Sequence, residues 1–398
     1  MKILMVSPTP ACPPTAGNRA RILALARAVR ELGHDLHFAY LAPRGADPVT
    51  RAAHMAEFGA DHFHSLDLDG RDALQRRLQE KWRAVRRRLR IGDPHLYRLD
   101  EWYFRSYHVA LQQLDAVHGF DAVICEYVFM SRALEAFDPR ALKILDTHDA
   151  FGDRHLEFLK VGRPPQWYST SKAEELRGFR RANAVIAIQP SEAERFARDL
   201  GSAPPTLHTV SHFLDLSRRA PASAAPAAAF VGSGNDINIS ALDHLRRNIL
   251  PRILARRPDF RLVVAGSICE RVMDQPEILR LGRIDHISDA FAQAPIALNP
   301  TLFGTGINIK QLDAMAAGVP SVSTETGSRG FAAPERDGYI ATVPDEDPQA
   351  FADAVVDLLG QPDRRAAMAD NAFSAAQAWN ARQTDALKSL LLSKSVVN

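Results

Sequence analysis

The first half of the chain alternates short apolar runs with stretches of helical periodicity. Residues 2–7 are an apolar run, and a segment rich in Pro, Thr and Gly follows it as far as Gly17. The next apolar residues recur at helical spacing: Ile22, Ala26, Val29 and Leu32. Gly33 ends this helix, and residues 36–41 form the next apolar run. Further runs of strand length lie at 121–125, 143–146 and 184–188. Strands alternating with helices predict a parallel sheet with right-handed crossovers.

The second half repeats this pattern after a stretch of Ala and Pro at 218–228. Predicted strands lie at 228–231, 261–265 and 295–298, and predicted helices at 242–253, 309–317, 347–360 and 363–394. The chain has 398 residues, more than one hydrophobic core usually serves. We therefore predict an N-terminal Rossmann-like domain at 1–215, a linker at 216–228, a second at 229–375, and a C-terminal helix at 376–398 packing back on the first. The predicted class is α/β, with two doubly wound domains facing across a cleft of strand-end loops.

Composition narrows the functional classes. A net charge of +2 gives no general affinity for nucleic acid, so we expect no nucleic-acid partner. The three cysteines are far apart and contain no CxxC pair, which is typical of a reducing compartment and argues against structural zinc. The first apolar run is too short for a signal peptide, and no apolar stretch approaches the roughly 18 residues that span a bilayer. We expect a cytoplasmic protein, with any membrane contact peripheral and at the inner face of the membrane.

The most informative segment is FGTGINIKQLDAMAAGVP, from Phe303 to Pro320. A Gly-rich turn here feeds a helix N-terminus, whose free N–H groups favour an anion. Lys310 near the helix start opposes the helix dipole, which is sensible if a diphosphate lies beside it. Asp313, one turn further on the same face, could accept hydrogen bonds from ribose hydroxyls. The alternative is a solvated helix with an incidental Lys–Asp pair.

This segment resembles the nucleotide-sugar motif of the retaining GT-B glycosyltransferases of family 4, the group 1 glycosyltransferases. It matches the branch that reads GTG-hydrophobic-x-hydrophobic-K-x-L-E/D-A-M-A-A-G-x-P. The resemblance implies that Asp313 holds the ribose. It also implies that the diphosphate is bound by Lys310, Thr305, Gly306 and Ile307. Many members carry a glutamate eight positions before the acid, contacting the donor sugar, and Thr305 stands there in this chain.

Other segments resemble the same family. The loop containing Gly17 and Asn18 is similar to the N-terminal glycine loop that approaches donor phosphate and acceptor. In the run DTHDAF, His148 resembles the histidine that touches the donor sugar. The alternatives are an ordinary loop and a histidine bonded to a neighbouring carboxylate. A metal site formed by Asp146, His148, Asp149, Asp153 and His155 is a further alternative. Since the family neutralises the leaving group with helix N-termini and cations, we expect no metal and no cofactor.

The second domain opens as the family's does, with Gly232 and Ser233 placed to let the backbone approach the phosphates. Many members continue with an Arg and a Lys that clamp the diphosphate, whereas this chain has Asn235–Asn238 there. Lys310 would then carry more of the phosphate charge. Arg283 and Ile284 stand where the family's backbone pairs with the nucleobase.

The resemblance has a gap at about 45–115, which contains a strongly basic segment. Eight Lys or Arg residues lie between Arg76 and Arg90, against one acid, Glu80. Five apolar residues recur there at helical spacing: Leu74, Leu78, Trp82, Val85 and Leu89. One interpretation is a helix at 74–90 whose apolar stripe packs on the N-terminal domain, with solvated arginines. The other is peripheral contact with an anionic membrane, beside a lipid-linked acceptor.

Together these patterns predict a hexosyltransferase of bacterial-type polysaccharide or glycoconjugate biosynthesis. It would move a sugar, with retention, from a nucleotide-diphosphate sugar to a glycan, lipid-linked or protein acceptor. The predicted catalytic residues are His148, Lys310 and Asp313, with the acceptor near Gly17 and Asn18. Glu126, at a strand end, is a candidate nucleophile. An epimerase or hydrolase of nucleotide sugars, and a catalytically silent binding or scaffold protein, are the alternatives. The sequence does not indicate an oligomeric state.

Overall fold

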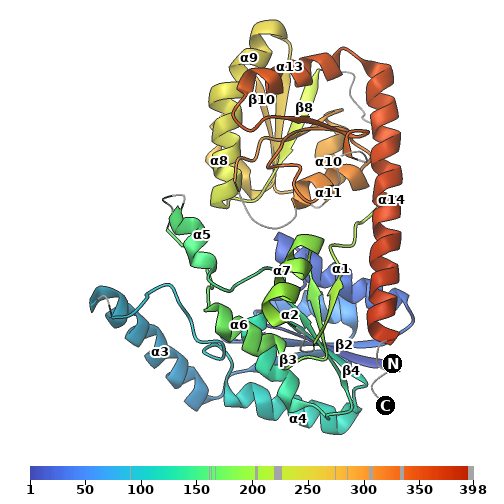
Figure 1. The fold of residues 1–398 in the computed structure, drawn as a ribbon. Coiled ribbons are helices and arrows are strands. Elements are labelled where there is room, and N and C mark those ends of the chain that lie inside the picture. The colour runs from blue at the N-terminus through green and yellow to red at the C-terminus, as the bar shows by residue number, and fades with distance from the viewer. Residues whose placement is uncertain are drawn as a thin grey trace. The chain divides into compact units, whose positions relative to one another are not determined.

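The computed structural model consists of two compact units (Figure 1). It describes residues 1–89, 91–160, 162, 164–165, 167–201, 205–218, 226–273, 275–284, 286–303, 308–331 and 336–392. Unit 1 comprises Met1–His212 and the chain from Gln383 on, and unit 2 is Phe213–Arg382. The predicted linker at 216–228 is described only at its two ends, because residues 219–225 lie outside the described ranges.

Unit 1 contains a seven-stranded parallel sheet in the order β3-β2-β1-β4-β5-β6-β7. Its strands are β1 (Lys2–Ser7), β2 (Asp35–Ala42), β3 (Phe63–Asp67), β4 (Ala122–Glu126), β5 (Leu142–Asp146), β6 (Ala184–Ala187) and β7 (Thr206–Thr209). Strands β4 and β6 are buried along their whole length and β1 is buried from Ile3 on, as expected for a sheet covered on both faces.

The helices of unit 1 connect these strands as crossovers. They are α1 (Gly17–Glu31), α2 (Pro48–Phe58), α3 (Gly70–Leu89), α4 (Arg105–His118), the 3₁₀ segment η1 (Val128–Ala136), α5 (Arg154–Lys160), α6 (Lys172–Phe179) and α7 (Pro190–Leu200). Local sequence sets their ends. Asp47 caps α2 by accepting a hydrogen bond from the Thr50 N–H, and Gly119 ends α4 in the left-handed conformation.

Unit 2 contains a six-stranded parallel sheet in the order β10-β9-β8-β11-β12-β13. Its strands are β8 (Ala227–Val231), β9 (Arg261–Ala265), β10 (Ile278–Gly282), β11 (Ala297–Asn299), β12 (Ser321–Thr324) and β13 (Ile340–Val343). Its helical segments are α8 (Asp236–His244), the π-helical turn η2 (Leu245–Ile249), α9 (Leu250–Arg256), η3 (Ser267–Arg271), α10 (Ile287–Ala292), α11 (Ile309–Ala316) and α13 (Pro348–Leu359). Apolar side chains from α9, α13 and the sheet form its largest core cluster.

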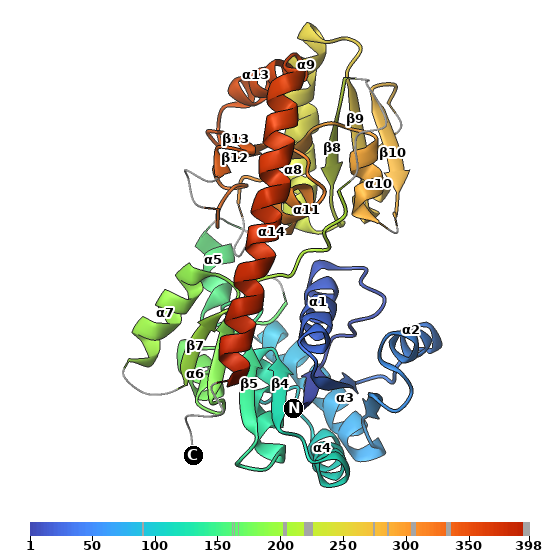
Figure 2. The same ribbon diagram turned by 90° about the vertical axis from the view of Figure 1, so that its right-hand side faces the viewer.

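The last helix, α14 (Pro362–Leu392), belongs to both units, and Figure 2 shows it as one continuous helix. It begins in unit 2, and its residues from Gln383 on belong to unit 1. There the Gln383 side-chain oxygen accepts a hydrogen bond from the Ser211 N–H at 2.7 Å. The sequence placed a boundary at 375, inside this helix.

Strand order reverses once in each sheet, and the reversal locates the candidate sites. In unit 1 it falls between β1 and β4, and in unit 2 between β8 and β11. Open α/β sheets bind ligands outside the carboxyl ends of the strands at such a point. The prediction of two doubly wound α/β domains is therefore confirmed. None of the helices in the described part of the chain is long and apolar enough to cross a bilayer.

Candidate functional site

The candidate donor site of unit 2 lies at the carboxyl ends of β8 and β11. The chain leaves β8 through Gly232 and Ser233 and enters α8, where the Asn235 side chain caps the helix by accepting a hydrogen bond from the Asn238 N–H at 2.9 Å. Gly266 follows the neighbouring strand β9 with a φ of +97°. A Cβ at this position would lie 2.2 Å from the Gly232 carbonyl oxygen, so only glycine fits here. The backbone turns after β8 and β9 are therefore packed directly against each other.

Lys310, in the first turn of α11, contacts the start of α8. Its Nζ donates a hydrogen bond to Asn238 Oδ1 at 2.6 Å, and it lies 5.7 Å from the centre of the Phe230 ring. The Asn238 amide is fixed from its other end, because its Nδ2 donates to the Ser233 carbonyl at 3.0 Å. The segment Asn235–Asn238 is thus in direct contact with Lys310 through Asn238.

Asp313 and Lys310 influence each other's ionisation. Burial raises the pKa of Asp313 to about 7, and the nearby Lys310 charge offsets only part of this shift. Burial also lowers the pKa of Lys310 to about 8, with Asp313 opposing the change. Among the described residues, we find no hydrogen bond or ion pair to the Asp313 carboxylate. Such a pair suits a ligand that brings negative charge to the lysine and hydroxyl groups to the carboxylate.

Several predicted donor contacts cannot be placed. Thr305, Gly306 and Ile307 lie outside the described residues, so their binding of the diphosphate stays a prediction. Arg283 is exposed and forms an ion pair with Glu270 at 3.2 Å. It follows Gly282 at the end of β10, next to β9 in the sheet, and Ile284 is half-buried.

In unit 1 the strand ends bring together a histidine and two carboxylates. Glu126 and Asp146 end the adjacent strands β4 and β5 and are paired in register. His148 has a φ of +60°, a left-handed conformation that is unusual for a residue with a side chain. Its Nε2 forms a short hydrogen bond with Glu126 Oε2. The alternative of a histidine bonded to a neighbouring carboxylate therefore describes its contact, and its predicted role at the donor sugar stays a prediction.

The second carboxylate, Asp146, is held by Arg21 of α1. The guanidinium donates to both Asp146 oxygens at 2.8 and 2.7 Å and to the Ser211 carbonyl at 2.8 Å. Both side chains are buried, with 3% and 0% exposure. Sequence reasoning missed Arg21. The available signal was a charged residue directly before Ile22, on the apolar face of the predicted helix.

The predicted acceptor loop reaches His148 through an aromatic ring. Tyr127 stacks on the His148 ring with centroids 4.0 Å apart and planes inclined by 15°. The Asn18 Nδ2 donates a hydrogen bond to the Tyr127 hydroxyl at 3.1 Å. Gly17, the first residue of α1, precedes Asn18 directly. Three segments distant in sequence, at 17–18, 126–127 and 148, thus form one connected group.

The charges around Glu126 and His148 determine which chemical roles this pair can have. Burial and the Asp146 charge raise the pKa of Glu126, while the His148 hydrogen bond and Arg21 oppose the shift. Glu126 Oε1 is buried without a partner among the described residues. The pair of Glu126 and His148 can therefore hold a proton between them or orient a polar ligand group.

A metal ion suits this group poorly. Ligand atoms of Glu126, Asp146 and His148 lie within 4.8 Å of one another. However, both Asp146 oxygens accept hydrogen bonds from Arg21, whose positive charge would repel a cation. The larger set considered from sequence is dispersed, since Asp149 pairs with Arg154 and His155 pairs with Asp93.

A second candidate surface is the basic helix α3, at the periphery of unit 1 in Figure 1. The expectation that its apolar stripe packs on the domain is wrong, because the stripe faces solvent. Its five residues are between 42% and 61% exposed: Leu74, Leu78, Trp82, Val85 and Leu89. An open groove along α3 is lined by Arg71, Leu74, Gln75, Leu78, Gln79 and Trp82.

The polar side of α3 is the one that packs. Asp72 is buried and accepts a hydrogen bond from the Ser106 N–H at 2.7 Å. Arg83 forms an ion pair with Glu101 at 3.2 Å, and its guanidinium carbon lies 3.3 Å from the centre of the Tyr97 ring. Asp72 and Arg83 are eleven residues apart, about three helical turns, so they lie on one side of the helix and the apolar stripe lies on another.

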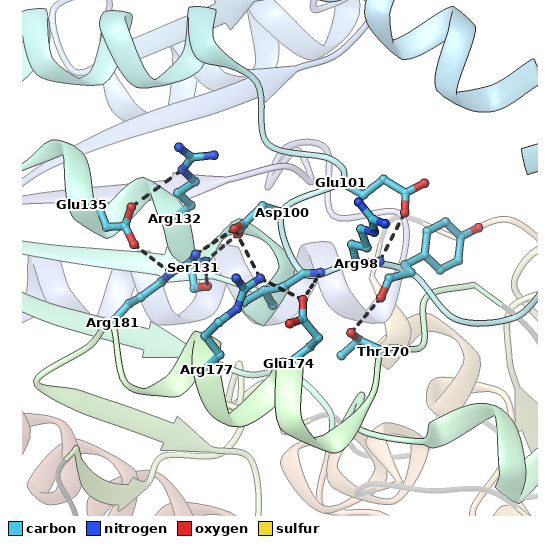
Figure 3. Close-up of polar contacts among 12 residues, drawn as sticks. Arg98, Asp100, Glu101, Ser131, Arg132, Glu135, Thr170, Glu174, Arg177 and Arg181 are labelled. Carbon is cyan, nitrogen blue, oxygen red and sulfur yellow. Dashed lines mark hydrogen bonds and ion pairs between the residues drawn. The ribbon is translucent and has the colours of Figure 1, made fainter. Parts of the chain in front are cut away.

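The segment that receives Arg83 is itself firmly anchored, as Figure 3 shows. Asp100 forms an ion pair with Arg181 at 2.6 Å, and Thr170 donates a hydrogen bond to the Tyr97 carbonyl at 2.8 Å. Glu174 accepts from the Leu99 N–H at 3.0 Å. Because this segment is fixed to α6 and to the residues on either side of α6, it determines the orientation in which α3 packs.

Comparison with known proteins finds a family match in the second half of the chain. Residues 225–361 match the model of the family "Glycosyl transferases group 1". D-inositol 3-phosphate glycosyltransferase 2 of Catenulispora acidiphila is 27% identical over 246 residues, which cover 54% of this chain and 57% of the relative. The match thus spans a little over half of that protein's length.

Solved structures show the same fold over the whole chain. The structure of Staphylococcus aureus TarM with UDP aligns with a TM-score of 0.67 at 9% identity, covering 99% of each chain. The pneumococcal O-GlcNAc transferase GtfA, in complex with UDP and GlcNAc, gives 0.68 at 11% identity, also covering 99% of each. Sucrose-phosphate synthase from Thermosynechococcus elongatus gives 0.65 at 16% identity, covering 100% of this chain and 99% of the other. This chain therefore has the fold of the GT-B glycosyltransferases, and its residues 225–361 match the group 1 family.

Proposed function

We propose that this protein is a glycosyltransferase that uses a nucleotide-diphosphate sugar. The observation that carries the proposal is the arrangement of Lys310, Asn238 and Asp313 at the strand-order reversal of unit 2. A cation and a carboxylate lie there without a full set of protein partners, in the segment that matches the group 1 family. Structural neighbours solved with UDP support a nucleotide as the ligand.

The proposed roles follow from charge. Lys310 stabilises the leaving diphosphate as negative charge develops. The electrostatic attraction of a fixed cation is stronger in a site from which water is partly excluded than in bulk water. Asp313 accepts hydrogen bonds from the ribose hydroxyls. In unit 1, Glu126 orients His148 toward the donor sugar, while Gly17 and Asn18 contact the acceptor. We further propose retention at the anomeric carbon and a role in making polysaccharides or glycoconjugates.

Nucleotide binding tests this proposal directly. Thermal unfolding of the full chain is measured with UDP-, GDP- and dTDP-sugars, each with and without acceptor glycans. A ligand at 100 times its dissociation constant should stabilise the protein by about 2.7 kcal/mol. Failure of every nucleotide sugar to bind would contradict the proposal and favour a silent scaffold protein. Conversion of a bound donor without any acceptor would instead indicate an epimerase or a hydrolase.

We also propose that α3 docks the protein on an anionic membrane, beside a lipid-linked acceptor. The exposed apolar stripe is a surface that water solvates poorly, and the basic residues Arg77, Lys81 and Arg88 lie along one flank of it. Each basic residue near an anionic surface contributes about 1 kcal/mol of attraction. An apolar stripe bordered by positive charge matches lipid tails below anionic headgroups.

Vesicle flotation tests the docking. The full chain should float with vesicles containing phosphatidylglycerol, less so at high salt, and should not float with pure phosphatidylcholine. The double variant Leu78→Glu/Trp82→Glu should lose binding. Val117→Glu is the matched control, because Val117 is 78% exposed on α4. Equal flotation of all three proteins would contradict docking through α3, as would a stable dimer in which α3 is covered.

A further inference from the structure

Unit 1 contains a group of histidines that the proposed transfer does not use. Asp35 and His37 lie at the start of β2. His62 directly precedes β3, His64 is the second residue of β3, and His118 is the last residue of α4. Parallel strands all begin at one edge of their sheet, so this group lies at the edge opposite to Glu126 and Asp146. We name it the histidine cluster: Asp35, His37, His62, His64 and His118.

The ring nitrogens of the cluster converge. His37 Nδ1 lies 3.0 Å from His64 Nε2, and the His118 ring centre is 4.6 Å from that of His37. Ligand atoms of these three histidines lie within 4.8 Å of one another. Two nitrogens bound to one tetrahedral Zn²⁺ are about 3.3 Å apart, given Zn–N bonds of about 2.0–2.1 Å. The His37–His64 nitrogen separation is close to that expected in a three-histidine site, and side-chain rotations within the 4.8 Å group would complete it.

The surroundings suit metal-ligating imidazoles. Asp35 Oδ1 lies 3.8 Å from His37 Nε2, the nitrogen that does not face His64, and 3.0 Å from His62 Nε2. A carboxylate near the second ring nitrogen is the usual partner of a metal-bound histidine, since it fixes the tautomer that presents the other nitrogen.

We propose that His37 Nδ1, His64 and His118 bind one Zn²⁺ ion, with Asp35 orienting His37. Imidazole ligands select zinc and the later transition metals over Mg²⁺ and Ca²⁺, which prefer oxygen. The ion would link β2, β3 and α4 at the sheet edge opposite to Glu126 and Asp146. The inference is independent of the proposed transferase activity, because it concerns a structural ion and none of the residues assigned to transfer.

The test uses full-length protein without a polyhistidine tag, freed of metal with a chelator. Dialysis against Zn²⁺ followed by elemental analysis should give one ion per chain, and Zn²⁺ should raise the melting temperature. Co²⁺ in its place should give the intense visible absorption bands of a tetrahedral site. His64→Ala and His118→Ala should each weaken binding at least tenfold, an effect no smaller than the loss of an outer-shell partner.

His208→Ala is the matched control, because His208 lies on β7, outside the cluster, and should bind as the parent does. Circular dichroism of the metal-free variants establishes that each is folded before binding is compared. If a cluster variant does not fold, Co²⁺ spectra and stoichiometry of the parent decide the question. Absence of stoichiometric binding by the parent would overturn the proposal. Binding that is unchanged in folded His64→Ala and His118→Ala would overturn it equally.

Discussion

The charged side chains at the carboxyl strand ends of the two units differ in how many partners the protein gives them. In unit 1, Arg21 donates to both oxygens of Asp146, and His148 is bonded to Glu126. In unit 2, Lys310 bonds a neutral amide, and the structure gives the Asp313 carboxylate no partner among the described residues. The first group is internally neutralised, whereas the second has a cation and a carboxylate with capacity for additional partners.

This difference indicates that the two groups have different roles: one holds neighbouring residues in position, and the other binds a ligand. A charge that is already paired and buried cannot form new ionic contacts without losing old ones, so it serves to hold neighbouring groups in place. A cation and a carboxylate whose pKa values are both displaced toward neutrality gain stability when a ligand supplies the missing partners. The comparison therefore assigns ligand affinity to unit 2 and geometric support to unit 1, and four experiments test that assignment.

The largest expected effect is on folding and comes from Arg21→Met. Removing the guanidinium leaves the buried Asp146 carboxylate without its partner, which should cost about 3–5 kcal/mol of unfolding free energy. Urea denaturation at pH 7 measures it. Arg27→Met is the control, because Arg27 pairs with Glu57 at the surface, where such pairs contribute at most about 1 kcal/mol. A similar small loss in both variants would mean that unit 1 does not depend on this pair.

Lys310→Ala should abolish most of the donor binding and leave the fold intact. Burying the lysine ammonium costs solvation free energy in the folded state, so removing this side chain should cost the protein little stability. The diphosphate, however, loses the cation that binds it. Turnover should fall by about 100-fold or more, the size expected for one electrostatic contact to a developing charge. Lys388→Ala, on the exposed side of α14, should behave as the parent does. Near-normal transfer by Lys310→Ala would contradict the assignment of donor binding to this site of unit 2.

Glu126→Gln should have a smaller effect, confined to turnover. The amide keeps the shape but removes the charge that orients His148, so kcat should fall by about 10- to 100-fold while donor affinity stays constant. Glu135→Gln, which alters a partly exposed ion pair of Arg181, is the matched control. Loss of donor affinity in Glu126→Gln would show that unit 1 also binds the nucleotide.

The smallest expected effect is a pH dependence of donor affinity. Binding requires ionised Asp313 and protonated Lys310, whose pKa values in the free protein are about 7 and about 8. Affinity should therefore be greatest between these values, falling below pH 7 as Asp313 takes up a proton and above pH 8 as Lys310 loses one. Calorimetric titrations from pH 6 to 9 measure it. Asp313→Asn should remove the decline on the acid side, and persistence of that decline would contradict the assignment.

Much of the fold could be predicted from sequence because its central strands are continuous apolar runs. The runs at 2–7 and 261–265 are strands with these bounds, and both sheets are parallel as expected. The strands β3, β7 and β13 were not predicted. They lie at or beside sheet edges, and β3 and β7 mix polar and apolar residues, so their sequences lack a continuous apolar run.

The candidate sites were only partly predictable. Lys310 and Asp313 share one helix face, a local relation that spacing reveals. The contact of His148 with Glu126 depends on β4 and β5 being neighbours, and strand order is not encoded in local pattern. The apolar stripe of α3 was expected to be buried under one interpretation, yet the Arg83–Glu101 ion pair and the hydrogen bond from the Ser106 N–H to Asp72 fix the helix by its polar side.

Lys310 has one more consequence, for chemical labelling. It is the only lysine in the sequence between Phe213 and Arg382. An amine with a pKa of about 8 has a large nucleophilic fraction at pH 8, whereas an ordinary lysine has well under a hundredth. A small acylating reagent would therefore modify unit 2 at a single position, which a peptide digest could report by mass. Protection of that position would measure occupancy by a nucleotide without a radioactive donor or a coupled assay.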